Sequence, residues 1–278
     1  MSPATALQQS GVPVRPSAGS AWRDALHAEW TKARTLTGTA WLLVAAVVLT
    51  VAVSATVSAT VKCPSGSCAE DPAKISLTGI YLGQAVIAIV AVLAVTGEYG
   101  TGMIRLTLAA MPRRTTVLAA KAVILAGLVV PAGAIAVGLS MLAGRFILAS
   151  NGIDPAHGYP MLSFSNGADL RAGVGSVLYL ILIAFFSLGV ASVVRDSAVA
   201  IGVVLGLLYL FSIIGATGSG STARHIAQIG PMTAGLAIQA TTNLPSLPIS
   251  PWAGLGVLAA WAAGALVLGG LLLRLHDA

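Results

Sequence analysis

Residues 35–61 read TLTGTAWLLVAAVVLTVAVSATVSATV and contain no Asp, Glu, Lys, Arg or His. Five further intervals of the chain are free of charge in the same way, each at least 22 residues long. A helix needs about 20 apolar residues to cross about 30 Å of hydrocarbon, and a charge at its centre costs about 2.5–3.5 kcal/mol. The sequence therefore predicts an all-α membrane protein with six transmembrane helices, at about 39–61, 77–97, 118–144, 172–194, 198–216 and 252–273.

The composition and charge of the chain agree with this class. Of its 278 residues, 56% are hydrophobic and 9% are charged, against about 25% charged in soluble domains. The net charge is +6, but no basic cluster with interleaved aromatics accompanies it, so we expect no nucleic-acid partner. Cytoplasmic loops collect Lys and Arg. Ten of these residues fall on the N-terminal side of the predicted topology and five on the other, which places both termini in the cytoplasm.

The region before the first span divides in two. Residues 1–20 are rich in Pro, Ser, Gly and Gln, and we expect a disordered cytoplasmic tail. Residues 21–38 show helical spacing, with Trp22, Leu26 and Trp30 on one face. An amphipathic helix with such a face lies in the headgroup layer, which predicts an interfacial elbow helix. The alternative is a plain extension of the first span. Residues 39–278 form the six-span domain.

Two outer segments leave alternatives open. Cys63 and Cys68 lie in the string CPSGSC, and on an oxidising outer face they either form a disulfide or remain free thiols. Residues 226–242, IAQIGPMTAGLAIQATT, are too apolar for a free loop. They are expected to form either a short re-entrant element in the outer leaflet or a surface helix.

Small residues recur four apart in two spans. Gly79 and Gly83 form one small-xxx-small pattern, and Gly202 and Gly206 form another. Such patterns allow close helix approach, which serves either dimerisation or packing within the chain.

Catalytic and metal-binding motifs are absent from the sequence. It contains no GxSxG, HExxH or GxxxxGK[ST], its four histidines are scattered, and two cysteines alone do not make a metal site. We therefore expect neither enzymatic activity nor a metal in this chain. Ion-coupled carriers bind their ion with ionisable groups at membrane depth, and the spans carry no such charged group. The mild polar side chains that could line a substrate path are Thr50, Ser54, Ser58 and Gln84. The alternative is that the hydroxyls bond their own helix backbone.

One inner loop is substantial: residues 97–121, GEYGTGMIRLTLAAMPRRTTVLAAK. Met103, Leu108 and Met111 give it apolar surface, interleaved with Arg105 and Thr107. A short cytoplasmic helix that is both apolar and basic can dock a protein partner. The alternative is a loop that lies on lipid headgroups.

This loop resembles that of the bacterial ABC type-2 transporter permeases, the membrane subunits of ATP-driven exporters common in actinobacteria. The resemblance rests on the acidic-aromatic pair Glu98-Tyr99, the run Gly-Thr-Gly-x-Ile-Arg-x-Thr-Leu over 100–108, Pro112-Arg113-Arg114, and Lys121 opening span three. The elbow sequence AEWTKARTLTGTAW, the six spans and the short tail extend it over nearly the whole chain. The ending Arg274-Leu275-His276-Asp277 departs from the family, in which Arg-Asp often follows directly.

The resemblance implies that residues 97–114 hold a coupling helix seated in a separate ATP-binding subunit. The residues that it places in this coupling element are Glu98, Tyr99, Thr101, Arg105, Thr107, Leu108, Arg113 and Arg114; the apolar surface adds Met103 and Met111. It further implies a dimer of permeases, most simply a homodimer, with two ATPases, in the bacterial cell membrane. The chain would bind no cofactor, because ATP and Mg²⁺ sit on the partner.

The expected function is therefore that of an exporter permease, associated with multidrug or antibiotic resistance. It would move a small amphiphilic substrate outward, such as a drug, an antibiotic, a peptide or a lipid-like molecule. An ion-exporting or lipid-translocating permease is the alternative within this class. A polytopic membrane enzyme or assembly protein without an ATPase partner is the alternative outside it.

Overall fold

The structure is a computed structural model that describes residues 18–35, 37–62, 71–100, 114–153, 162–217 and 220–275. Six of its helices are long and apolar enough to cross a membrane, and the described residues contain no strand. These six are α2 (Thr37–Thr60), α4 (Ile80–Gly100), α6 (Arg114–Ser150), α7 (Gly167–Val194), α8 (Ser197–Thr217) and α11 (Pro251–Leu275). The prediction of an all-α protein with six apolar helices is confirmed.

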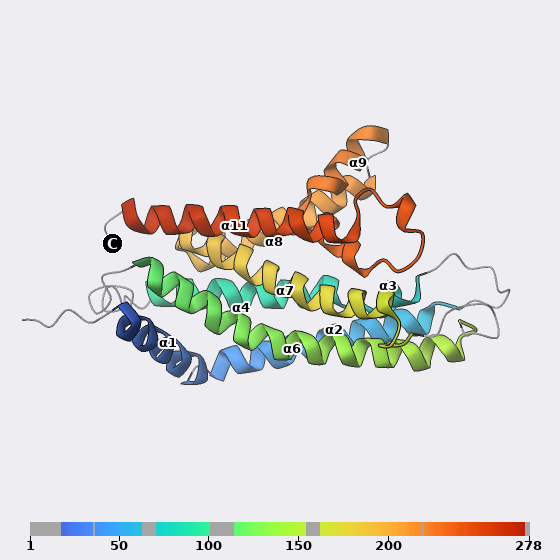
Figure 1. The fold of residues 1–278 in the computed structure, drawn as a ribbon, viewed down its shortest axis with the longest axis horizontal. Coiled ribbons are helices and arrows are strands. Elements are labelled where there is room, and N and C mark those ends of the chain that lie inside the picture. Colours follow the sequence, from blue (N-terminus) through green and yellow to red (C-terminus); the bar gives the residue numbers. More distant parts are fainter. Residues whose placement is uncertain are drawn as a thin grey trace, which may run out of the picture.

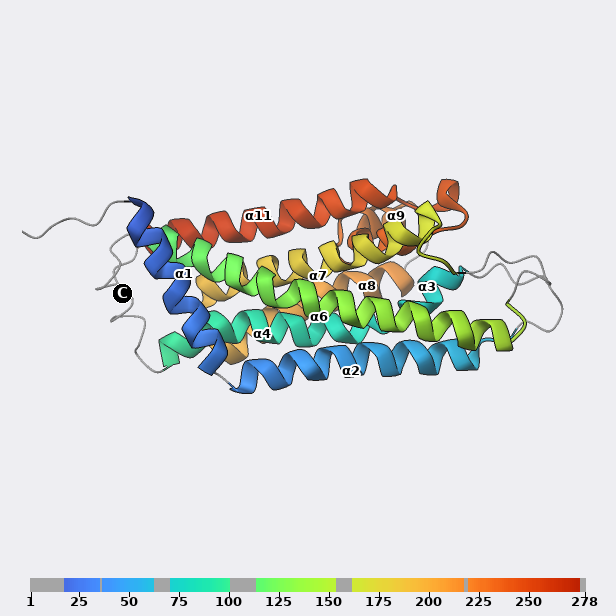
Figure 2. The same ribbon diagram turned by 60° about the horizontal axis from the view of Figure 1, so that its bottom comes forward.

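The long helices run side by side, and the shorter elements lie at the two ends of the bundle (Figure 1). The helix α1 (Ala18–Thr35) crosses one end, beside the start of α6 (Figure 2). The end of α11 lies on the same side. At the opposite end are α3 (Pro72–Ser76), α9 (Gly220–Ile229), α10 (Pro231–Gly235), and the 3₁₀ turns η2 (Leu236–Gln239) and η3 (Leu244–Ser246). We call the end that carries α1 the inner end, following the predicted orientation.

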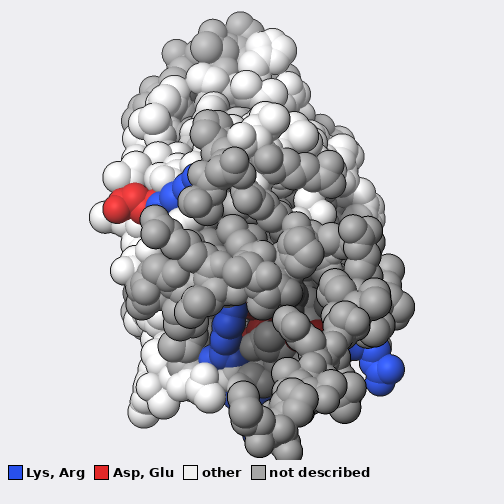
Figure 3. Space-filling model, turned by 90° about the vertical axis from the view of Figure 1, so that its left-hand side faces the viewer, with Lys and Arg blue, Asp and Glu red and all other residues white. Residues whose placement is uncertain are grey.

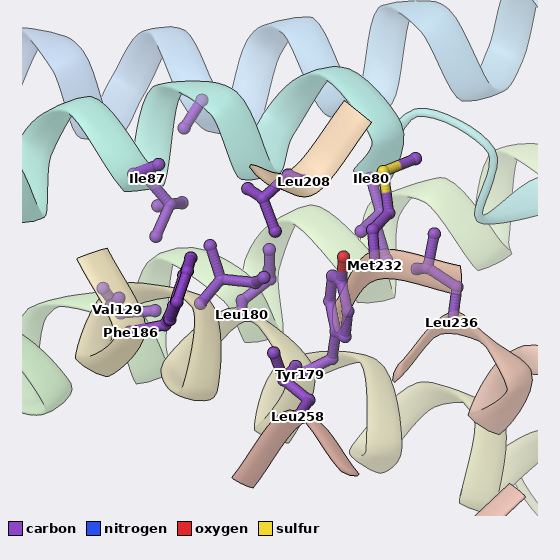
Figure 4. Close-up of a cluster of buried hydrophobic side chains, with 14 of the residues drawn as sticks. Ile80, Ile87, Val129, Tyr179, Leu180, Phe186, Leu208, Met232, Leu236 and Leu258 are labelled. Atoms are coloured by element: carbon purple, nitrogen blue, oxygen red, sulfur yellow. The ribbon is translucent and has the colours of Figure 1, made fainter. Parts of the chain in front are cut away.

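Two helices form the interior of the bundle. In their most apolar windows, 61% of the α4 residues and 56% of the α7 residues are buried, against 22% for α2 and 17% for α8. The largest buried side chains of α7 are Tyr179, Ile183, Phe186 and Leu188. Figure 4 shows Tyr179 and Phe186 among apolar side chains from several helices. The remaining helices therefore pack around an α4–α7 centre and present apolar faces outward, as a lipid-facing surface requires.

The helix α6 is longer than its charge-free interval predicts. Its 37 residues span about 55 Å at the rise of an α-helix, well beyond the hydrocarbon thickness. The predicted span, 118–144, is only the part between Lys121 and Arg145 that is free of charge, with a few flanking residues. The absence of charge marks the part of a helix that can lie in lipid. This helix continues past that part at both ends.

The outer segment 226–242 divides at Gly230. The residues before it form the end of α9, where Ile229 is 54% exposed. The residues after it form α10 and η2, which pack against α7 and α11 and bury Met232 and Ile238. Neither alternative from the sequence describes the whole segment, because only its second half folds back into the bundle.

A single carboxylate ties this segment to the first outer loop. Asp71 caps α3 by accepting from the backbone N–H groups of Ala73 and Lys74, at 3.2 and 3.3 Å. The same carboxylate accepts from the Thr241 hydroxyl at 2.7 Å and the Thr242 N–H at 3.0 Å. Each donor would otherwise need another acceptor at this end of the bundle.

The two glycine patterns are used differently. A Cβ at Gly79 would lie 1.9 Å from the Thr50 carbonyl oxygen, and one at Gly83 would lie 2.0 Å from the Thr50 hydroxyl. This pair therefore serves close packing of α4 on α2 within the chain. At Gly202 and Gly206 on α8, a Cβ would meet nothing within 4 Å.

This contrast predicts opposite effects for the same substitution. Gly79→Ala should reduce the free energy of unfolding by about 1–3 kcal/mol, because the added methyl collides with the Thr50 backbone. Gly202→Ala should leave the free energy of unfolding unchanged or raise it by up to about 1 kcal/mol, because Ala has a higher helix propensity than Gly. Thermal unfolding of the purified chain in detergent measures both. Equal stability of the two variants would contradict the close approach of α2 and α4.

Candidate functional site at the inner end

Four charged side chains from three helices meet at the inner end of the bundle. Glu29 and Lys32 come from α1, Glu98 from the last turn of α4, and Lys121 from the second turn of α6. The Lys121 ammonium lies 2.8 Å from Glu29 Oε2 and 2.6 Å from Glu98 Oε1. The Lys32 ammonium lies 3.0 Å from Glu29 Oε1 and 2.8 Å from Glu98 Oε1. We call these residues the four-charge cluster.

The cluster is buried and balanced. Glu29, Glu98 and Lys121 are each 7% exposed. Lys121 has three donors, and the third bonds the Ala94 carbonyl at 3.1 Å, so all three are used. A buried charge is tolerated only when it is paired and hydrogen-bonded. The alternation of two carboxylates with two ammonium groups meets that requirement.

The pKa of Lys32 follows the same balance. Burial lowers the pKa of its ammonium, but the hydrogen bonds and charges of Glu98 and Glu29 outweigh that effect and raise the pKa above its usual value. A raised pKa stabilises the fold fully at pH values below the pKa of the unfolded chain, about 10.4. That stabilisation is lost only as the pH rises through the folded-state pKa. The contribution of the Lys32 ammonium is therefore fully present throughout the physiological range.

The cluster joins α1 to both helices that border the inner loop. Glu98 lies two residues before Gly100, the last residue of α4, and Lys121 lies seven residues after the first residue of α6. Residues 101–113 connect these two helices. Any displacement of the loop that moves α4 or α6 therefore acts on α1 through charge-assisted hydrogen bonds.

A second contact joins the last turn of α4 to the turn between α7 and α8. The Arg195 guanidinium lies 5.7 Å from the ring centroid of Tyr99 and donates to the Leu272 carbonyl of α11 at 3.4 Å. Arg195 ends α7 in a left-handed conformation, with φ of 63°, which is uncommon for a residue other than glycine. This cation–π geometry links the α7–α8 turn to the end of α4.

Figure 3 views the molecule from the inner end. Blue basic side chains lie beside a recess in which red acidic atoms are visible. The described residues hold no group of three or more His, Cys, Asp or Glu that could bind a metal ion.

The predicted coupling residues are only partly within the described chain. Glu98 and Tyr99 lie at the junction, and Arg114 begins α6. The others lie outside the described residues: Thr101, Met103, Arg105, Thr107, Leu108, Met111 and Arg113. Cys63 and Cys68 also lie outside them. The coupling helix and the disulfide stay predictions.

The residues predicted for a substrate path are buried between helices in this structure. Thr50 donates to the Ala46 carbonyl of its own helix at 2.6 Å, and Ser54 accepts from the Gly79 N–H at 3.0 Å. The Ser58 carbonyl accepts from the Asn151 amide at 3.1 Å, and Ser58 is fully buried. The contacts of Ser54 and Ser58 hold α2 against other segments, the Thr50 hydroxyl bonds its own helix, and the path stays a prediction.

Gln84, on α4, is also fully buried. Its amide oxygen accepts from the Tyr179 hydroxyl of α7. Its amide nitrogen donates to the Tyr81 carbonyl at 3.2 Å and lies 3.1 Å from the Met232 sulfur. Gln84 thereby joins α4, α7 and α10, and the burial of this polar side chain is compensated by its partners.

Sequence reasoning missed the roles of Glu29, Lys32 and Arg195. The signal that could have found them is that two glutamates and two lysines lie near the predicted inner ends of three segments. Which of them meet depends on helix packing. The face of α1 that packs on the bundle holds Ala25 and Glu29, which are buried, whereas Trp30 on the predicted apolar face is 42% exposed.

No protein-family model matches the chain, and no curated protein matches its sequence. The resemblance to ABC type-2 permeases therefore rests on the residues of the inner loop and on the order of the spans.

Removing one charge from the cluster should destabilise the fold. Lys121→Met leaves two buried carboxylates with one ammonium, and breaking a buried pair costs about 3–5 kcal/mol. Adding Glu29→Gln restores the charge balance and should recover part of that loss. Arg34→Met removes an exposed charge and should cost less than about 1 kcal/mol. Thermal unfolding in detergent compares the three. A Lys121→Met variant as stable as the wild type would contradict the assignment.

Proposed function

We propose that this chain is the membrane-spanning permease subunit of an ATP-binding-cassette exporter. In this proposal it moves a small amphiphilic substrate outward with ATP that a separate subunit hydrolyses, and it binds no nucleotide itself. The observation that carries the proposal is the four-charge cluster. It attaches α1 to the two helices that border the inner loop, so that a force on the loop reaches three helices at once.

The energy source follows from what the spans lack. An ion-coupled carrier needs Asp, Glu, His or Arg at membrane depth, and the six charge-free intervals supply none. A second polypeptide is then the simplest source, and the 101–113 loop is its proposed docking element. Arg105 and Arg113 would contact that subunit, with the Met103 and Met111 side chains filling its groove.

The proposed movement passes through the junctions at the inner end. Closure of two partner ATPases displaces the loop, the cluster carries α1 with α4 and α6, and Tyr99 passes the movement to the α7–α8 turn through Arg195. The helix α8 is the least buried of the spans. Its outward apolar side chains, among them Val199 and Leu210, are proposed to face a second permease copy across the substrate path.

Recovery of an ATPase with the tagged chain tests the proposal. Purification in mild detergent from the native host should recover a nucleotide-binding subunit with the wild-type chain. The double charge reversal R105E/R113E should abolish that recovery, because both arginines are placed at the contact, and should leave membrane insertion intact.

The matched control is K62E/K74E, which reverses two charges at the opposite end of the bundle. It should recover as much ATPase as the wild type does. Absence of an ATPase from the wild-type purification, even after cross-linking, would remove the proposal. Equal recovery with both double variants would remove the assignment of Arg105 and Arg113 to the contact.

A further inference from the structure

A cavity of about 430 Å³ lies at the inner end between α1, the start of α2, α4 and α6. Its volume falls within the range of small-molecule sites, about 300–1,000 Å³. Helices that are far apart in the sequence line it together, among them α1 and α6. It is therefore a feature of the packed bundle rather than a gap within one turn.

The two parts of the cavity differ in chemistry. One part is formed by the four-charge cluster, and the other by apolar side chains of α2, α4 and α6, among them Leu42, Leu93 and Leu128. Leu93 is 40% exposed, so the apolar part is accessible from the side of the bundle, where a lipid chain would lie. A ligand with a charged group at one end and an apolar chain at the other matches this division.

The charged side chains around the cavity decide whether the charged group of such a ligand is positive or negative. Besides the neutral cluster, the described side chains at this end include three arginines, Arg23, Arg34 and Arg195, against two aspartates, Asp24 and Asp196. Within the cluster, Lys32 is the accessible member: its side chain is 26% exposed, against 6–8% for the other three. The mouth of the cavity therefore presents an ammonium group in a basic field, which favours an anionic headgroup.

We propose that this cavity binds one anionic glycerophospholipid from the leaflet that faces α1. Its phosphate lies beside Lys32, and one acyl chain runs along Leu93 and Leu128. Bound there, the lipid fills the space beneath α1 and supports the attachment of that helix to α4 and α6. The binding requires neither an ATPase partner nor a transported substrate, so its test is independent of the proposed transport function.

Native mass spectrometry of the purified, delipidated chain tests the proposal by titration with phosphatidylglycerol. One lipid per chain should be retained. Phosphatidylcholine with the same acyl chains should bind at least about tenfold more weakly, because its headgroup carries no net negative charge. Glycerophosphate, which has the anionic group without the chains, should not bind at the same concentration. Equal binding of the two lipids would overturn the assigned charge, and binding of glycerophosphate would overturn the assigned apolar part.

A matched pair of variants locates the lipid. Ala94 lines the cavity, and Ala94→Phe fills it; retention of phosphatidylglycerol should fall at least about tenfold. Ala263 lies exposed on α11, outside the cavity, and Ala263→Phe should retain the lipid as the wild type does. Equal retention by both variants would show that the lipid binds elsewhere. If Ala94→Phe does not fold, the comparison of the two lipids and glycerophosphate on the wild type still decides the proposal.

Discussion

Lys121 holds its ammonium group at the inner edge of the bundle, and Glu29, Glu98 and the Ala94 carbonyl accept its three hydrogen bonds. A charge in this position is costly unless every donor is used and the opposite charge is close. The bundle itself supplies only Glu98 and the carbonyl, and α1 supplies Glu29. The need to complete this set explains why an amphipathic N-terminal helix lies with a polar face against the other helices.

The same need for polar compensation organises the outer half of the molecule. Gln84 is buried in the α4–α7 centre, and its partners come from α7 and from α10. Asp71 joins the first outer loop to the end of the folded-back segment. Each junction connects segments far apart in sequence, so the helices are held in register by few polar contacts within a largely apolar surface. Such contacts have discrete partners, as the proposed transport function would require of a bundle that changes between two packed arrangements.

The sequence predicted the existence of the six helices well, because the cost of a charge in hydrocarbon acts on single positions and needs no knowledge of packing. Their ends were less accessible: α6 runs to Ser150, past the limit that Arg145 sets on its lipid-embedded part. The segment 226–242 was recognised as too apolar for a loop, but its division at Gly230 depends on contacts with α7 and α11. The burial of Glu29 was not predicted, since the partner that makes this burial favourable lies 92 residues away.

The central claim is that the four-charge cluster holds α1 to the helices that border the inner loop. Pulsed electron–electron double resonance in lipid nanodiscs measures this attachment directly. The spin labels are placed at Thr31 on α1 and Ala119 on α6, which are both exposed. Cys63 and Cys68 are replaced by Ser in this background. Glu29→Gln with Lys32→Gln removes the α1 share of the cluster and leaves the Glu98–Lys121 pair in the bundle. We predict one narrow distance distribution for the wild type and a broad one for this double variant. A distribution that stays narrow and unshifted in the double variant would contradict the account.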